Sequence, residues 1–141
     1  MSALLLDTHI VLWLDGADAR LRPSTRVLID DHWRNGGTVL ISAVTAWEIA
    51  QLANAGRLML DLPAGEWIER MADHPGIEII PLTHRAVTGA YRLHHLDHKD
   101  PADRLLIATA IEHACPLISY DTHIARFSAD HGIQYGFTIA A

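Results

Sequence analysis

Short apolar runs alternate along the chain with longer segments in which apolar residues recur every three or four positions. The short runs are typical of strands that are buried on both faces, and the longer segments are typical of helices that cover a sheet. The pattern predicts strands at residues 4–6, 38–41, 77–80 and 117–120, with room for a short fifth strand at residues 133–137.

The segments between these runs carry the signals of helix ends. Ser24 and Thr83 are expected to cap helices that run to about residues 34 and 93, and Gly36-Gly37 is expected to end the first of them. Further helices are predicted at residues 8–14, 43–54, 64–72 and 101–113. Strands that alternate with helices predict an α/β fold, in which helices flank both faces of a central parallel sheet of four to five strands.

The composition is that of one globular domain spanning residues 1–141, because 50% of the residues are hydrophobic and no linker or low-complexity segment interrupts the chain. No apolar run approaches the ~20 residues of a membrane-spanning helix, and no basic residue precedes the first apolar run. We therefore expect no membrane segment and no signal peptide. The single cysteine, Cys115, lies among apolar residues and fits a reducing cytoplasm.

The net charge of −6 argues against a protein that coats nucleic acid through charge alone, but it leaves a nuclease open. Ten of the eleven basic residues are arginines, whose planar guanidinium suits phosphate recognition, although genomic codon bias explains the same excess. Five arginines are candidates for a substrate-binding rim: Arg20, Arg22, Arg26, Arg57 and Arg126.

The tetrapeptide Asp-Thr-His-Ile occurs twice, at residues 7–10 and 121–124, and each copy follows an apolar run. Asp7 and Asp121 therefore end predicted strands, Glu48 falls in the helix after the second strand, and Asp103 falls in the first turn of a later helix. In a parallel sheet the carboxyl ends of the strands and the amino ends of the helices share one edge, where α/β folds bind ligands.

Each acid also has a simpler explanation at a helix start. Asp7 and Asp121 suit N-caps, Thr45 and Glu48 have the spacing of a capping box, and an acid such as Asp103 is favoured by the helix dipole. Capping does not require an acid at every junction, however, because Ser, Thr and Asn serve as well. Taken together, the four carboxylates predict a site for Mg²⁺ or Mn²⁺, which prefer oxygen ligands.

The histidines and tryptophans give weaker evidence about function than the acids do. His94 and His98 have an i,i+4 spacing that suits zinc, but neither they nor His95 belong to a standard zinc pattern. His9 and His123 follow the strand-end acids, where they can lie near a phosphate or support the start of a helix. The tryptophans are expected mainly in the core or in a subunit interface.

Four segments of this chain resemble the PIN domain, and in particular the VapC-type toxins of bacterial toxin–antitoxin systems. The residues that carry the resemblance are 4–9 (Leu-Leu-Leu-Asp-Thr-His), 47–49 (Trp-Glu-Ile), 100–110 (Asp-Pro-Ala-Asp-Arg-Leu-Leu-Ile-Ala-Thr-Ala) and 117–121 (Leu-Ile-Ser-Tyr-Asp). The similarity covers nearly the whole chain, and the segment from Asp100 is its most specific part.

The resemblance implies a three-layer fold and a Mg²⁺- or Mn²⁺-dependent endoribonuclease that cleaves RNA, forms a homodimer and is held inactive by a cognate antitoxin protein. It assigns metal binding and catalysis to Asp7, Glu48, Asp103 and Asp121. Supporting roles or phosphate contacts are expected of four further residues: Thr8, Asp100, Arg104 and Ser119.

Two other classes of protein remain as alternatives. A non-catalytic interaction module would keep the same fold, although the complete set of acids speaks against it. A receiver domain of a signalling system also has an acidic Mg²⁺ pocket, but it needs an acid pair at the first strand, an acid at a middle strand and a lysine near the last strand. Here the third strand ends at Pro81 and the only lysine is Lys99.

Overall fold

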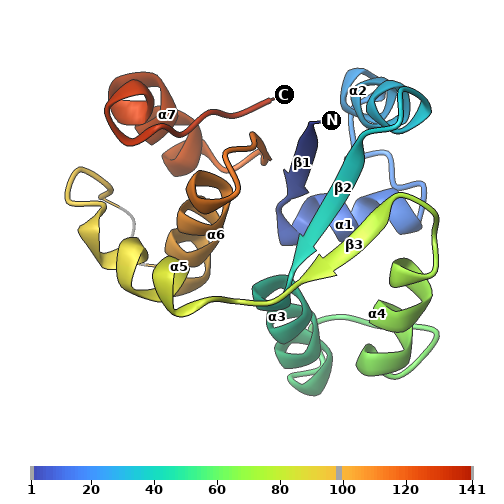
Figure 1. The fold of residues 1–141 in the computed structure, drawn as a ribbon. Helices are drawn as coiled ribbons and strands as arrows, with labels where there is room; N and C mark the ends of the chain where they lie inside the picture. The colour runs from blue at the N-terminus through green and yellow to red at the C-terminus, as the bar shows by residue number, and fades with distance from the viewer. Residues whose placement is uncertain (1, 98–99, 141) are drawn as a thin grey trace.

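A parallel sheet with the strand order β3-β2-β1-β4 forms the centre of the computed structural model, which describes residues 2–97 and 100–140 (Figure 1). The strands are β1 (Ala3–Leu6), β2 (Thr38–Ser42), β3 (Ile77–Ile80) and β4 (Leu117–Ile118). Neighbouring strands pair in parallel throughout this sheet. The expected α/β class and four of the expected strands are therefore confirmed.

Helices occupy the connections between the strands. They are α1 (Thr8–Asp15), α2 (Pro23–Arg34), α3 (Ala43–Asn54), α4 (Ala64–Ala72), α5 (His84–Gly89), the 3₁₀ helix η1 (Ala90–Arg92), α6 (Pro101–Glu112) and α7 (Thr122–Tyr135). In Figure 1, α5, α6 and α7 lie on one side of the sheet, and α1, α2 and α4 lie on the other.

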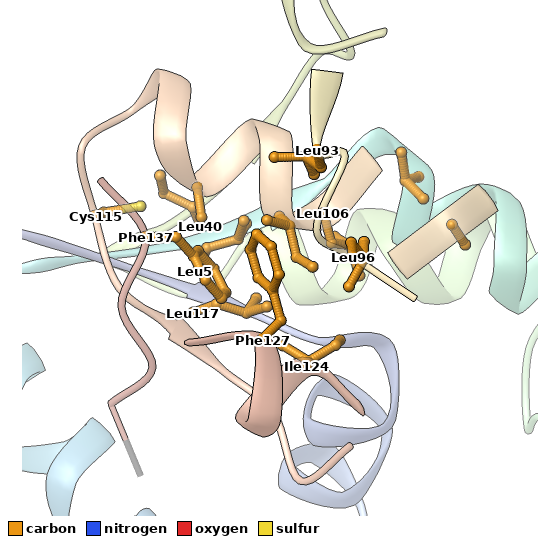
Figure 2. Packing of buried hydrophobic residues seen from close by; sticks show 14 of the residues in the cluster. Leu5, Leu40, Leu93, Leu96, Leu106, Cys115, Leu117, Ile124, Phe127 and Phe137 are labelled. Atoms are coloured by element: carbon orange, nitrogen blue, oxygen red, sulfur yellow. The ribbon is translucent and has the colours of Figure 1, made fainter. Parts of the chain in front are cut away.

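The alternation of side chains along the strands divides the core into two layers. In β1, Leu5 packs with the cluster that includes Leu106, Ile124 and Phe127, whereas Leu4 and Leu6 pack with the cluster on the opposite face. Figure 2 shows the first cluster, in which side chains of α6 and α7 meet those of the sheet. The protein is therefore a three-layer structure with a helical layer on each face of the sheet.

The order of the strands places a topological switch point between β1 and β4. From β1 the chain proceeds to β2 and then to β3 on one side, and it returns to place β4 on the other side of β1. Connections that leave in opposite directions open a crevice at the carboxyl ends of the two central strands, which is the usual ligand site of such folds.

Two local predictions in this set are wrong. Ser24 does not cap α2, because Pro23 occupies the first turn and the cap position falls on Arg22, which makes no side-chain capping bond. The segment at residues 133–137 is not a strand, because α7 continues to Tyr135 and Gly136 ends it with a left-handed φ of 69°. A parallel bridge instead joins Ile139 to Leu117. Thr83 caps α5 as expected, since its hydroxyl accepts the Ala86 N–H, and the helical segment continues as η1 to Arg92.

Candidate active site

Asp7 lies at the end of β1 and is 7% exposed. Its Oδ1 accepts a hydrogen bond of 2.7 Å from the Thr8 backbone N–H, and its Oδ2 accepts one of 2.6 Å from the Ser119 hydroxyl. Burial raises the pKa of the Asp7 carboxyl above its ordinary value, and the hydrogen bonds from Ser119 and Thr8 oppose that rise. The site therefore holds a buried carboxylate by donors on two different strand ends.

Glu48 projects from the second turn of α3 rather than from its start, because α3 begins at Ala43 and is capped by Ser42. The capping-box explanation is therefore wrong. Glu48 Oε1 instead accepts a hydrogen bond of 2.5 Å from the Thr8 hydroxyl. Burial raises the pKa of Glu48, the Thr8 hydroxyl opposes the rise, and the negative charges of Asp7 and Asp100 add to it.

Asp100 and Asp103 stand at the start of α6. Asp100 is the N-cap and accepts a hydrogen bond of 2.9 Å from the Ala102 N–H, and Pro101 occupies the first position. Asp103 lies in the first turn and is 8% exposed, as buried as Asp7. The expected order of cap, proline and acid is confirmed, and the apolar α6 anchors it because one face of that helix is buried in the core.

Ser119 joins the ends of β1 and β4. While its hydroxyl donates to Asp7, its oxygen accepts a hydrogen bond of 3.1 Å from the Asp121 backbone N–H. Asp121 in turn caps α7, and its Oδ1 accepts hydrogen bonds from the N–H groups of His123 and Ile124. One chain of hydrogen bonds thus connects the carboxyl ends of β1 and β4 at the switch point.

The predicted acids meet at one cavity of about 370 Å³ at this edge of the sheet. Five carboxylates line it, those of Asp7, Glu48, Asp100, Asp103 and Asp121. Tertiary structure therefore brings together the four acids that the sequence singled out, along with Asp100, for which a supporting role is expected. Their combined negative charge attracts cations to the cavity.

Four further residues line the cavity: His9, Ile10, Trp13 and Tyr120. Ile10, Trp13 and Tyr120 were not expected there. The repeated tetrapeptide could have indicated two of these residues, because Ile10 belongs to its first copy and Tyr120 directly precedes its second copy. Trp13 follows His9 by four positions, which places both on one face of α1.

Arg104 has a different environment from the acids. Its guanidinium donates hydrogen bonds to the backbone carbonyls of Ala90, Leu93 and Leu96, at 3.2, 3.4 and 2.9 Å. It does not belong to the lining of the acidic cavity. Arg104 thereby ties the start of α6 to the turn that follows η1.

The carboxylates surround the cavity without forming a closed cage. Within residues 2–97 and 100–140, no group of three His, Cys, Asp or Glu side chains is close enough to hold a metal ion by itself. This arrangement suits Mg²⁺, which keeps several waters and binds proteins through one or two carboxylates together with substrate phosphate. The oxygen donors therefore fit a hard divalent cation, with Asp7 and Asp103 as the most buried of them.

The histidines do not compose a zinc site in the part of the chain that the structure describes. His95 stacks on His131 with ring centroids 4.3 Å apart, and its Nδ1 lies 2.6 Å from the Tyr135 hydroxyl. His98, the partner proposed for His94, lies outside the described residues. Nor is any helix of the described chain long and apolar enough to span a membrane.

The fold and the site define a class: a three-layer α/β protein with an acidic cavity at its switch point. The chain matches the model of the PIN domain over residues 4–130, and the protein belongs to that family. It is 30% identical to Ribonuclease VapC22 of Mycobacterium tuberculosis over 124 residues, which cover 88% of this chain and 91% of that protein. Membership of the PIN domain family excludes the receiver-domain alternative.

Solved structures share this fold. One is VapBC2 from Rickettsia felis bound to a DNA fragment from its promoter, with a TM-score of 0.68 and 15% identity over 98% of this chain and 97% of that one. Another is a toxin–antitoxin complex from Klebsiella pneumoniae, with a TM-score of 0.59 and 19% identity over 96% of this chain and 95% of that one.

Proposed function

We propose that this protein is a Mg²⁺- or Mn²⁺-dependent endoribonuclease that acts in the cytoplasm as the toxin of a toxin–antitoxin pair. The observation that carries the proposal is the cavity at the β1–β4 switch point, which gathers five carboxylates. The similarity to Ribonuclease VapC22 supports RNA as the substrate.

Asp7 and Asp103 are the principal candidates for metal binding because they are the most buried acids of the site. Glu48 and Asp121 complete the site, directly or through water. Thr8 and Ser119 act as positioning residues, since their hydroxyls hold Glu48 and Asp7. Asp100 adds negative charge at the same cavity.

A bound divalent cation supplies Lewis acidity toward the phosphodiester and lowers the pKa of a water molecule, so that hydrolysis needs no nucleophile from the protein. The residues of the chain hold the carboxylates in place against their mutual repulsion. The negative charge of these carboxylates also repels the polyanionic RNA until a bound cation neutralises the charge of the cavity.

Cleavage of total cellular RNA and transfer RNA by the purified protein tests this function. We expect cleavage with Mn²⁺ or Mg²⁺, none with EDTA, and a loss of at least about 100-fold in Asp7→Asn because an essential ligand is removed. Asp31→Asn is the matched control, since Asp31 is an exposed acid on α2 that is absent from the cavity. Full activity of Asp7→Asn would remove Asp7 from the mechanism. Metal binding without any cleavage would favour the non-catalytic interaction module.

The partner proposal rests on the toxin–antitoxin complexes that share the fold. We propose a cognate antitoxin that lays a helix in a groove of this protein and directs a basic side chain toward the acids, and a homodimer of the toxin. Growth arrest on expression, relieved by the partner, supports the toxin role. Light scattering of the purified protein measures the oligomeric state. A monomer that neither arrests growth nor copurifies with a partner contradicts both parts.

A further inference from the structure

A second cavity, of about 390 Å³, adjoins the acidic one. The two cavities share two lining residues, His9 and Trp13, so these side chains form the wall between them. The volume falls within the range of roughly 300–1,000 Å³ that is typical of small-molecule sites. A ligand that occupies the acidic cavity can therefore extend past Trp13 into a second, preformed space.

The wall is held by ring contacts on several sides. The Trp13 ring lies 5.7 Å from the His9 ring and 5.8 Å from the Tyr120 ring, measured between centroids. The Arg20 guanidinium lies 5.2 Å from the centroid of Trp13. Trp13 nevertheless remains partly exposed and lines both cavities. An indole in this position is an aromatic surface that is oriented before any ligand arrives.

The two cavities differ in the charge of the residues that line them. Five carboxylates line the acidic cavity, whereas Arg20, Arg57 and the single acid Asp18 line the second one. Asp18 is engaged by Arg20 through an ion pair of 2.7 Å. Arg57 is exposed; its backbone N–H donates to the Leu52 carbonyl, but its guanidinium makes no hydrogen bond or ion pair with another of the described residues. A polyanion is therefore drawn to the second cavity while the first requires a cation.

The remaining residues that line the second cavity have apolar side chains. They come from α1, α3, α4 and the segment between α3 and α4: Leu12, Leu52, Leu58, Met59, Leu60 and Trp67. Met59 is 92% exposed among these residues. Apolar side chains, an aromatic wall and an exposed guanidinium match the base and the phosphate of a nucleotide.

We propose that this second cavity binds a nucleobase of single-stranded RNA next to the scissile phosphate. The base packs against Trp13 and the apolar side chains of this lining, and Arg57 and Arg20 contact the adjoining phosphate. The inference rests on the proposed ribonuclease function and adds a base-binding subsite outside the acidic cavity. RNA is favoured over a protein partner because the exposed guanidinium of Arg57 suits a phosphate beside an aromatic surface that suits a base.

The test is the binding of a short, mixed-sequence single-stranded RNA, and of its duplex, measured by fluorescence anisotropy in EDTA at several salt concentrations. Arg57→Ala is expected to weaken binding about 10-fold and to reduce the slope of affinity against salt by about one. Trp13→Leu is expected to weaken it about 10-fold with little change in that slope. The duplex is expected to bind more weakly than the single strand to the wild-type protein.

Two matched variants serve as controls. Arg34 is exposed on α2 and Trp47 is 54% exposed on α3, and neither residue lines the two cavities. Arg34→Ala and Trp47→Leu are expected to bind RNA as the wild type does. Because Arg57 is exposed and unpaired, Arg57→Ala keeps the test valid even if Trp13→Leu does not fold.

The outcomes separate this inference from the nuclease proposal. If the wild type cleaves RNA but Arg57→Ala and Trp13→Leu bind and cleave like it, the subsite is refuted while the nuclease stands. If the wild type neither binds nor cleaves RNA, both are refuted. If the variants keep RNA binding and lose a copurifying protein, the cavity docks a protein instead, and the inference is wrong.

Discussion

Single hydrogen bonds connect the acids of this site. Thr8 donates its backbone N–H to Asp7 and its hydroxyl to Glu48, so one residue orients two carboxylates that come from different elements. Ser119 donates its hydroxyl to Asp7 and accepts a hydrogen bond from the backbone N–H of Asp121. Such donors matter because a buried carboxylate without them changes its protonation state rather than remaining charged.

Ser119→Ala tests this function of a hydroxyl. The change removes a donor that lowers the pKa of Asp7, so the pKa of Asp7 rises further and the acid limb of the pH–rate profile moves to higher pH. The loss of a buried bond to a charged group also lowers the free energy of unfolding by about 1–3 kcal/mol. Ser119→Thr, which keeps the hydroxyl, is the control. An unchanged pH profile in Ser119→Ala would refute the positioning role.

At the scale of elements, three acids of the cavity are also helix caps. Asp7, Asp100 and Asp121 accept backbone hydrogen bonds at the starts of α1, α6 and α7. Capping and metal binding are therefore compatible, because a carboxylate offers two oxygens with about four lone-pair sites. The parallel sheet and the helix starts together explain why a capping position is also a position at the cavity.

The junction before α6 depends on Arg104, which donates to three backbone carbonyls. We expect Arg104→Ala to lower the free energy of unfolding by about 2–4 kcal/mol, because partly buried carbonyls lose charged donors. Arg104→Lys is expected to recover only part of this, since an ammonium lacks the planar fork. Urea denaturation measures both variants. Equal stability of all three proteins would show that the junction does not rely on the guanidinium.

At the scale of the whole molecule, the buried negative charges of the cavity oppose folding when no metal is bound. Burial raises the pKa values of both Asp7 and Glu48, so the folded metal-free protein binds protons more tightly than the unfolded chain does. By linkage, the contribution of these two groups to the stability of the metal-free protein is greatest below their unfolded pKa values and is lost as the pH rises through the folded ones. A divalent cation that binds only the folded state reverses this loss.

Asp7→Asn is therefore expected to stabilise the protein in EDTA at neutral pH, by about 1.4 kcal/mol for each unit by which folding raises the pKa of Asp7. Its advantage over the wild type should shrink in acid, where the wild-type carboxyl is itself protonated. Thermal unfolding of both proteins in EDTA, at neutral and at acidic pH, measures this difference in stability. Adding Mn²⁺ should raise the Tm of the wild type much more than that of the variant. A variant that is less stable than the wild type at every pH contradicts the argument.

Local sequence predicted the strands and helices where the physical signal was local and strong. The apolar runs of β1 to β4 and the cap, proline and acid at the start of α6 needed no knowledge of distant residues. The predictions for Ser24 and for residues 133–137 failed because other local signals were stronger: a proline in the first turn of α2, and a helix, α7, that continues to Tyr135 and ends at Gly136.

The sequence by itself determined the fold class, the family resemblance and the edge at which Asp7, Glu48, Asp103 and Asp121 lie, because hydrophobic period and strand-end position are local properties. Only tertiary structure decided that Ser119 donates to Asp7, 112 positions away, and that Thr8 supports Glu48. It also decided that Trp13 separates an acidic cavity from one with a cationic rim. These contacts join elements that are distant along the chain, and they depend on strand order and helix packing, which no single segment encodes.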